Sequence, residues 1–69
     1  MNDHVYKIIE LVGTSETSIE EATEHAIATA SSSLEHLHWF EIDQVRGSVK
    51  DGKVTHYQVV LKAGFRLNN

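Results

Sequence analysis

The feature that most constrains this chain is an alternating apolar pattern near its C-terminus. Every second residue of this run is apolar: Tyr57, Val59, Leu61, Ala63, Phe65 and Leu67. Because successive side chains of a strand point to opposite faces, the pattern predicts a long strand with one face packed on a core. Gln58 lies between two of these positions and must therefore point away from that core.

The residues before this run predict a partner strand joined to it by a hairpin. Asp51 and Gly52 form a strong two-residue turn signal between residues 39–50 and 53–67. The two strands are therefore expected to pair in an antiparallel manner.

Within residues 39–50, alternation also assigns side chains to faces. Phe40 and Ile42 are the natural core-facing pair, which places Trp39 and Glu41 on the same outer face as Gln58. By the same alternation Arg46 falls on the face opposite Trp39, unless a bulge shifts the phase.

The first half of the chain predicts a strand followed by a helix. Residues 5–12 are rich in β-branched side chains, and Gly13 is expected to begin the turn that ends this strand. Ser18 and Glu21 have the spacing of a capping box, so the helix should begin there and end near residues 35–37. Its apolar stripe is dominated by small residues and can lie close against a sheet: Ile19, Ala22, Ala26, Ala30 and Leu34.

This element order predicts an α+β fold of β-α-β-β type, with one helix covering one face of a three-stranded antiparallel sheet. A single helix cannot cover both faces, yet the outer face also carries apolar side chains. We therefore expect other copies of the chain to bury that face, which would also protect the exposed edges of such long strands.

Length and charge limit the class of protein further. The 69 residues make one domain, 1–69, without cysteines and therefore without disulfides. A net charge of −4 argues against a nucleic-acid partner. Neither a signal peptide nor a membrane-spanning apolar stretch is visible, and a small fold without disulfides fits the cytoplasm.

The outer face carries the candidate binding residues. The Trp39 indole and the Gln58 amide together suggest a platform for a flat heteroaromatic ligand, because the amide both donates and accepts hydrogen bonds. Taken alone, Trp39 is more commonly a packing or interface residue, and Gln58 a solvated one. Glu41 and Asp43 lie two residues apart, and inter-subunit hydrogen bonds or ion pairs explain them better than acid–base chemistry.

Metal and catalytic sites are not expected. The chain has five histidines, but their spacing fixes no set of three ligands and includes no His-Glu-x-x-His motif: His4, His25, His36, His38 and His56. There is also no glycine-rich phosphate loop.

Three segments resemble the dodecin family, and the bacterial members most of all. Residues 6–15 (YKIIELVGTS) are similar to the opening strand and turn of that family. Residues 37–42 (LHWFEI) are similar to its tryptophan strand, and residues 57–67 (YQVVLKAGFRL) to its closing strand. The resemblance covers nearly the whole chain in the same element order.

The resemblance implies a hollow homododecamer that binds flavins, with the sheet partly wrapped around the helix. It implies that flavin pairs stack between Trp39 side chains of symmetry-related subunits and that Gln58 binds the polar edge of the ring. Arg46 corresponds to a position near the flavin. Glu41, on the same strand, is expected to be a further ligand contact. Arg66 corresponds to an arginine at the threefold channel, where coenzyme A is found in some relatives.

The expected function is non-enzymatic storage and photoprotective sequestration of FMN, riboflavin or a related flavin. A small flavin-dependent oxidoreductase is one alternative, although no nicotinamide fingerprint or redox cysteine supports it. A coenzyme A-binding or purely structural assembly module, with Trp39 as interface packing, is the other.

Overall fold

The computed structural model describes residues 3–67 and has the predicted element order. Its elements are β1 (Tyr6–Ser15), α1 (Ile19–Ser31), β2 (Leu37–Lys50) and β3 (Lys53–Arg66). The strands form one antiparallel sheet in the order β1-β3-β2, so the strand with the strongest alternation lies in the centre. Met1, Asn2, Asn68 and Asn69, the ends of the expected domain, lie outside the described residues.

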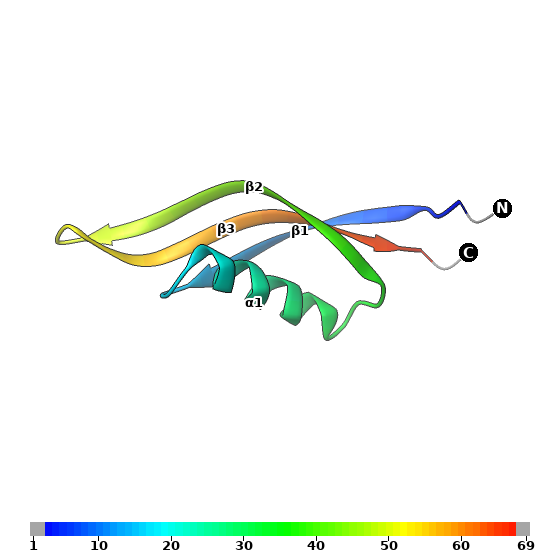
Figure 1. Ribbon diagram of the computed structural model, residues 1–69, viewed down its shortest axis with the longest axis horizontal. Helices are drawn as coiled ribbons and strands as arrows, with labels where there is room; N and C mark the ends of the chain where they lie inside the picture. Colours follow the sequence, from blue (N-terminus) through cyan, green and yellow to red (C-terminus); the bar gives the residue numbers. More distant parts are fainter. Residues whose placement is uncertain (1–2, 68–69) are drawn as a thin grey trace.

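The helix lies on one face of the sheet, against β1 and β3 (Figure 1). Val59, Leu61 and Ala63 of β3 are fully buried beneath it, as the alternating pattern predicts. The small residues Ala22 and Ala26 of α1 meet them and complete the core. We call this the helix face of the sheet and the opposite side the outer face.

Gly13 lies within β1 and does not begin a turn, so that expectation was wrong. A Cβ atom at this position would overlap the carbonyl oxygen of Ala22 and lie 3.0 Å from Cβ of Ala26. The glycine is therefore where the helix backbone approaches the sheet most closely. It pairs with Val59 of β3, and the strand continues two residues further, to Ser15.

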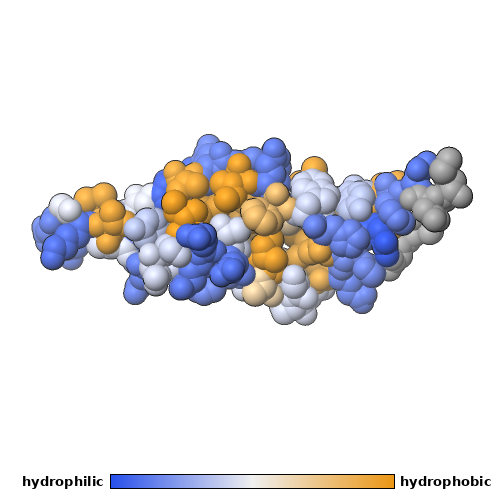
Figure 2. Space-filling model, viewed as in Figure 1, coloured by the Kyte–Doolittle hydropathy of each residue, from blue (hydrophilic) through white to orange (hydrophobic). Residues whose placement is uncertain are grey.

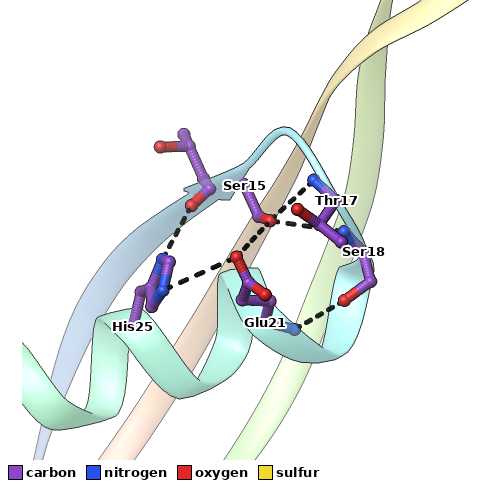
Figure 3. A network of polar contacts seen from close by, with 6 residues as sticks. Ser15, Thr17, Ser18, Glu21 and His25 are labelled. Atoms are coloured by element: carbon purple, nitrogen blue, oxygen red, sulfur yellow. Dashed lines mark hydrogen bonds and ion pairs between the residues drawn. The ribbon is translucent and has the colours of Figure 1, made fainter.

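Side-chain hydrogen bonds fix the start of the helix, as Figure 3 shows. Ser18 is the N-cap residue, and its hydroxyl accepts a hydrogen bond of 3.0 Å from the Glu21 N–H. The Ser15 hydroxyl accepts from the N–H groups of Thr17 (2.9 Å) and Ser18 (3.3 Å) and donates to the Glu21 carboxylate at 3.3 Å. Ser15 at the end of β1 thus accepts the hydrogen bond from the Ser18 N–H that a capping box would assign to the Glu21 side chain.

The helix ends at Ser31, earlier than the predicted end at residues 35–37. The hydroxyl of Ser32 donates to the Thr29 carbonyl oxygen at 2.7 Å, and that of Ser33 to the Ala30 carbonyl oxygen at 3.5 Å. Serine hydroxyls that bind the last carbonyls in this way compete with helix continuation. The chain then reverses through His36, which has a φ of 65°, and β2 begins at Leu37.

The molecule is too elongated to bury its own apolar surface. Its radius of gyration is 14.4 Å, against about 11 Å for a compact chain of this length. The hairpin of β2 and β3 extends beyond the N-terminal end of the helix (Figure 1).

The helix face of β2 is left uncovered as a result. Phe40, Ile42 and Val45 point to this side but are 51%, 41% and 47% exposed. Phe40 and Ile42 line an open groove of about 580 Å³ beside Ile19 and Ile27. Figure 2 shows apolar side chains exposed along much of the length of the molecule. Partner copies are therefore needed on the helix face of β2 as well as on the outer face.

The close approach at Gly13 predicts a large effect of one methyl group. Replacing Gly13 by Ala should lower the free energy of unfolding by about 1–3 kcal/mol, because the helix has to move away from β1. Chemical denaturation at a fixed protein concentration measures this change. Thr14→Ala, at the exposed neighbouring position, is the control, and equal stability of Gly13→Ala and the unmodified chain would contradict the packing described.

Candidate functional site

The pairing of the strands places the candidate residues on faces. Directly paired residues of neighbouring strands point to the same side, and the pairs on the outer face include Trp39 with Gly64 and Glu41 with Lys62. Gln58 has the same parity on β3 as Gly64. Trp39, Glu41 and Gln58 therefore share the outer face, as alternation predicts.

Arg46 also lies on the outer face, contrary to simple alternation. The pairing of β2 with β3 shifts by one residue between Ile42 and Gln44, leaving Asp43 as the extra residue of a β-bulge. After the bulge Arg46 pairs directly with Gln58, and its guanidinium donates a hydrogen bond to the Gln44 side-chain oxygen. Val45 is moved by the same shift to the helix face, opposite Val59.

The Trp39 indole lies over the central strand. A Cβ atom built at Gly64 would overlap Cε2 and Cζ2 of the indole and lie 2.7 Å from its Nε1. On the far side the ring of Tyr6, from β1, has its centroid 6.4 Å from that of Trp39 at an interplanar angle of 49°. The Trp39 side chain nevertheless stays accessible, since the residue is 40% exposed.

Trp39 and Gln58 lie at separate places along the outer face. Their positions on β3 are Gly64 and Gln58, six residues apart, which is about 20 Å at 3.3 Å per residue. A single tricyclic ring cannot contact both side chains of one chain. A site that uses Trp39 and Gln58 together must therefore take them from different copies.

Charged side chains occupy the stretch between these two positions. Lys62 forms an ion pair of 3.5 Å with Asp43 and is directly paired with Glu10 on one side and Glu41 on the other. The contact explains Asp43 as a structural partner of Lys62. Glu41 remains on the outer face, two residues along β2 from Trp39.

Arg66 lies at the Trp39 end of the sheet. It is half-buried and pairs with Tyr6 of β1, while its backbone N–H donates to the His36 carbonyl oxygen at 3.0 Å. Arg66 is therefore well separated from Arg46, which pairs with Gln58 near the middle of β3.

The histidines form separate contacts. His25 lies 3.8 Å from the Glu21 carboxylate and His56 lies 3.6 Å from that of Glu16, both at exposed positions. The Tyr6 hydroxyl lies 3.3 Å from Nδ1 of His38. Within residues 3–67 no three acidic or histidine side chains are grouped closely enough to hold a metal ion. In the same part of the chain, no helix has the length and apolar character needed to cross a membrane.

A small β-α-β-β chain with an accessible indole on an incompletely covered sheet defines a class of protein that completes its surface by self-association. The family model described as Dodecin matches residues 5–68. The chain belongs to the dodecin family.

Individual relatives agree with this assignment. The dodecin of Thermus thermophilus is 52% identical over 63 residues, covering 91% of each chain. The solved dodecin of Streptomyces coelicolor has a TM-score of 0.92 at 48% identity, covering 100% of this chain and 99% of its own. The dodecin of Streptomyces davaonensis also has a TM-score of 0.92, at 41% identity, covering 99% of this chain and 100% of its own.

Two residues of this region were missed from the sequence. Gly64 underlies the Trp39 indole, and Tyr6 lies at its edge. A glycine inside an otherwise regular strand was the available signal, since it marks a close approach by another group. The partner of Gly64 was not evident, because the bulges in β2 hide the pairing.

The bulge at Asp43 predicts which engineered cysteines will cross-link. Directly paired residues have Cα atoms about 4.5–5.5 Å apart, within the range that a disulfide spans. Because the chain has no cysteine of its own, Arg46→Cys with Gln58→Cys should form a disulfide within one chain on mild oxidation. Val45→Cys with Gln58→Cys is the matched control and should stay reduced. Mass spectrometry of the unreduced, denatured chain reads out both, and preferential cross-linking of the control pair would contradict the bulge.

Proposed function

We propose that this chain binds and stores flavins without catalysing a reaction, and that it protects them from light. The observation that carries the proposal is the accessible Trp39 indole on the outer face, in a chain of the dodecin family. An isoalloxazine ring is flat and amphipathic like indole. Offset stacking of two such rings contributes about 0.5–1.5 kcal/mol beyond the burial of their area.

The separation of Trp39 and Gln58 supports a site formed between subunits. A twofold axis repeats Trp39 on both sides of a stacked flavin pair, so that one residue type supplies two aromatic walls. The same axis brings Gln58 of another copy toward the polar edge of the ring, where its amide suits the alternating N–H and C=O groups. Glu41, two residues along β2 from Trp39 on the same face, is the further candidate contact.

A closed homododecamer fits the uncovered surface of the chain. Apolar residues remain exposed on both sides of the sheet, and both outer strands have free edges. Several interfaces per chain are needed to cover them. We place this assembly in the cytoplasm.

The arginines bear on which flavin is bound. FMN carries a phosphate and requires a cation on a chain whose net charge is −4. Arg46 supplies one next to Gln58, so FMN and riboflavin are the proposed ligands with Arg46 as the phosphate partner for FMN. Arg66, at the Trp39 end of the sheet, is the proposed contact for coenzyme A at a threefold channel.

The oxidoreductase alternative finds less support. A flavin stacked between Trp39 and a second flavin leaves little room for a second substrate, and the chain offers no redox cysteine. Oxidation of NAD(P)H by the flavin-loaded protein, measured at steady state against free FMN, distinguishes the two functions. Turnover well above that of free FMN would favour the enzyme.

Removing the indole should separate flavin binding from assembly. Trp39→Ala should weaken FMN binding at least about tenfold, the equivalent of ~1.4 kcal/mol, because the stacking surface is lost. Titration of FMN into the apo-protein, followed by quenching of flavin fluorescence, measures the affinity. Phe40→Leu, on the opposite face of the same strand, is the control and should bind FMN as the unmodified chain does. Unchanged quenching in Trp39→Ala would leave the indole an interface residue.

The exposed apolar surface predicts a single large particle in solution. Multi-angle light scattering should give a mass of about twelve times the 7.8 kDa of the chain. A soluble, folded monomer at micromolar concentration would contradict the assembly.

A further inference from the structure

Gly64 occupies an unusual place for a glycine. It lies inside β3, the central strand of the sheet, where glycine is disfavoured because it loses more conformational freedom on folding than other residues. Its backbone pairs with Ile8 of β1 on one side and Trp39 of β2 on the other. A glycine retained at such a position indicates that another group needs the space of its side chain.

The Trp39 indole takes that space. The built Cβ atom of Gly64 would overlap Cε2 and Cζ2 of the indole and lie 2.7 Å from Nε1. Three neighbouring ring atoms therefore lie above the Gly64 backbone. Any larger side chain at position 64 would lift or turn the indole.

Tyr6 limits the indole on the other side of the central strand. β1 and β2 are both neighbours of β3 and are therefore about 10 Å apart, so the Trp39 ring crosses over β3 to come near Tyr6. The centroids of the two rings are 6.4 Å apart. Tyr6 is itself held by His38, with 3.3 Å between its hydroxyl and Nδ1 and an edge-to-face contact at 5.8 Å.

We propose that Gly64 and Tyr6 are positioning residues that fix the Trp39 indole over the central strand before any ligand binds. Gly64 leaves the space that the indole occupies, and Tyr6 limits how far the indole can move. The inference rests on the proposed flavin site, where it identifies residues that set affinity through Trp39. Stacking depends on the relative placement of two rings, and an indole already in place loses less freedom when the ligand arrives.

Gly64→Ala tests the role of Gly64 with and without ligand. The chain has one tryptophan, so its fluorescence and near-ultraviolet circular dichroism report on Trp39 alone. In Gly64→Ala the dichroism band of the apo-protein should change, and the Kd for FMN should rise about tenfold, which corresponds to loss of most of the stacking energy. Unaltered dichroism together with unaltered FMN affinity would overturn the proposal.

A double-mutant cycle keeps the test valid where Gly64→Ala folds poorly. Gly64→Ala should lower the thermal midpoint of the otherwise unmodified chain, because the methyl group displaces the indole. In the Trp39→Ala background the same change should leave the midpoint unchanged or raise it, since alanine is preferred to glycine in a strand. An equal loss in both backgrounds would assign the effect to the backbone and would overturn the positioning role of Gly64.

Tyr6 variants test the role of Tyr6 separately. Tyr6→Ala should increase the mobility of Trp39, seen as lower fluorescence anisotropy on the nanosecond scale, and weaken FMN binding. Tyr6→Phe retains the ring and should keep most of the affinity. Equal affinity of Tyr6→Ala and the unmodified chain would remove Tyr6 from the proposal.

These measurements also separate the inference from the proposed function. The dichroism, anisotropy and midpoint experiments need no ligand, so the placement of Trp39 is tested even if FMN does not bind to the unmodified chain. In that case the proposed flavin function fails, and the ligand-free data alone decide whether Gly64 and Tyr6 position the indole.

Discussion

One helix has to cover a sheet of three strands, and the rest of the structure depends on that mismatch. A helix with its side chains is about 10–12 Å wide, enough for two strands spaced about 4.8 Å apart but not for the third. The small residues of α1 bring it close to β1 and β3 at Gly13, so it cannot also reach over β2. The helix face of β2 therefore keeps its apolar side chains exposed, and the chain depends on copies of itself to bury them.

The parts of the fold that follow from local chemistry could be predicted from the sequence. Strict alternation in β3 gave its core face, and Asp51–Gly52 gave the hairpin, where both residues have positive φ as this turn requires. Ser18 was found as the N-cap because its hydroxyl acts within one turn of helix. The helix end was missed because polar serines are also common on the solvent face of a continuing helix, so the sequence did not reveal that the hydroxyls after Ser31 bind the last carbonyls. The role of Gly13 was missed because it depends on the close approach of α1, which the residues around Gly13 do not reveal.

The faces of β2 show why alternation alone could not place the candidate site. Trp39 and Glu41 precede the bulge at Asp43 and were placed correctly, whereas Arg46 follows it and lies on the face opposite to the one that unbroken alternation gives. A one-residue insertion changes the face of every later side chain, but nothing in Asp43 itself distinguishes a bulge from a regular strand residue. The pairing with β3 decides it, because that register places Val45 opposite Val59 on the helix face and leaves Arg46 on the outer face.

The same geometry ties ligand binding to assembly. A sheet of one chain offers a single wall to a flat ring, and its indole and amide lie too far apart along β3 to be used together. In the proposed site a second copy supplies both the opposite wall and the missing hydrogen-bonding group, so that a ligand there would bind only associated chains. By mass action such a ligand stabilises the associated state, and association in turn creates the site. Under the proposed function, storage of a flat cofactor needs no further domain, because partner chains would complete the site on the outer face.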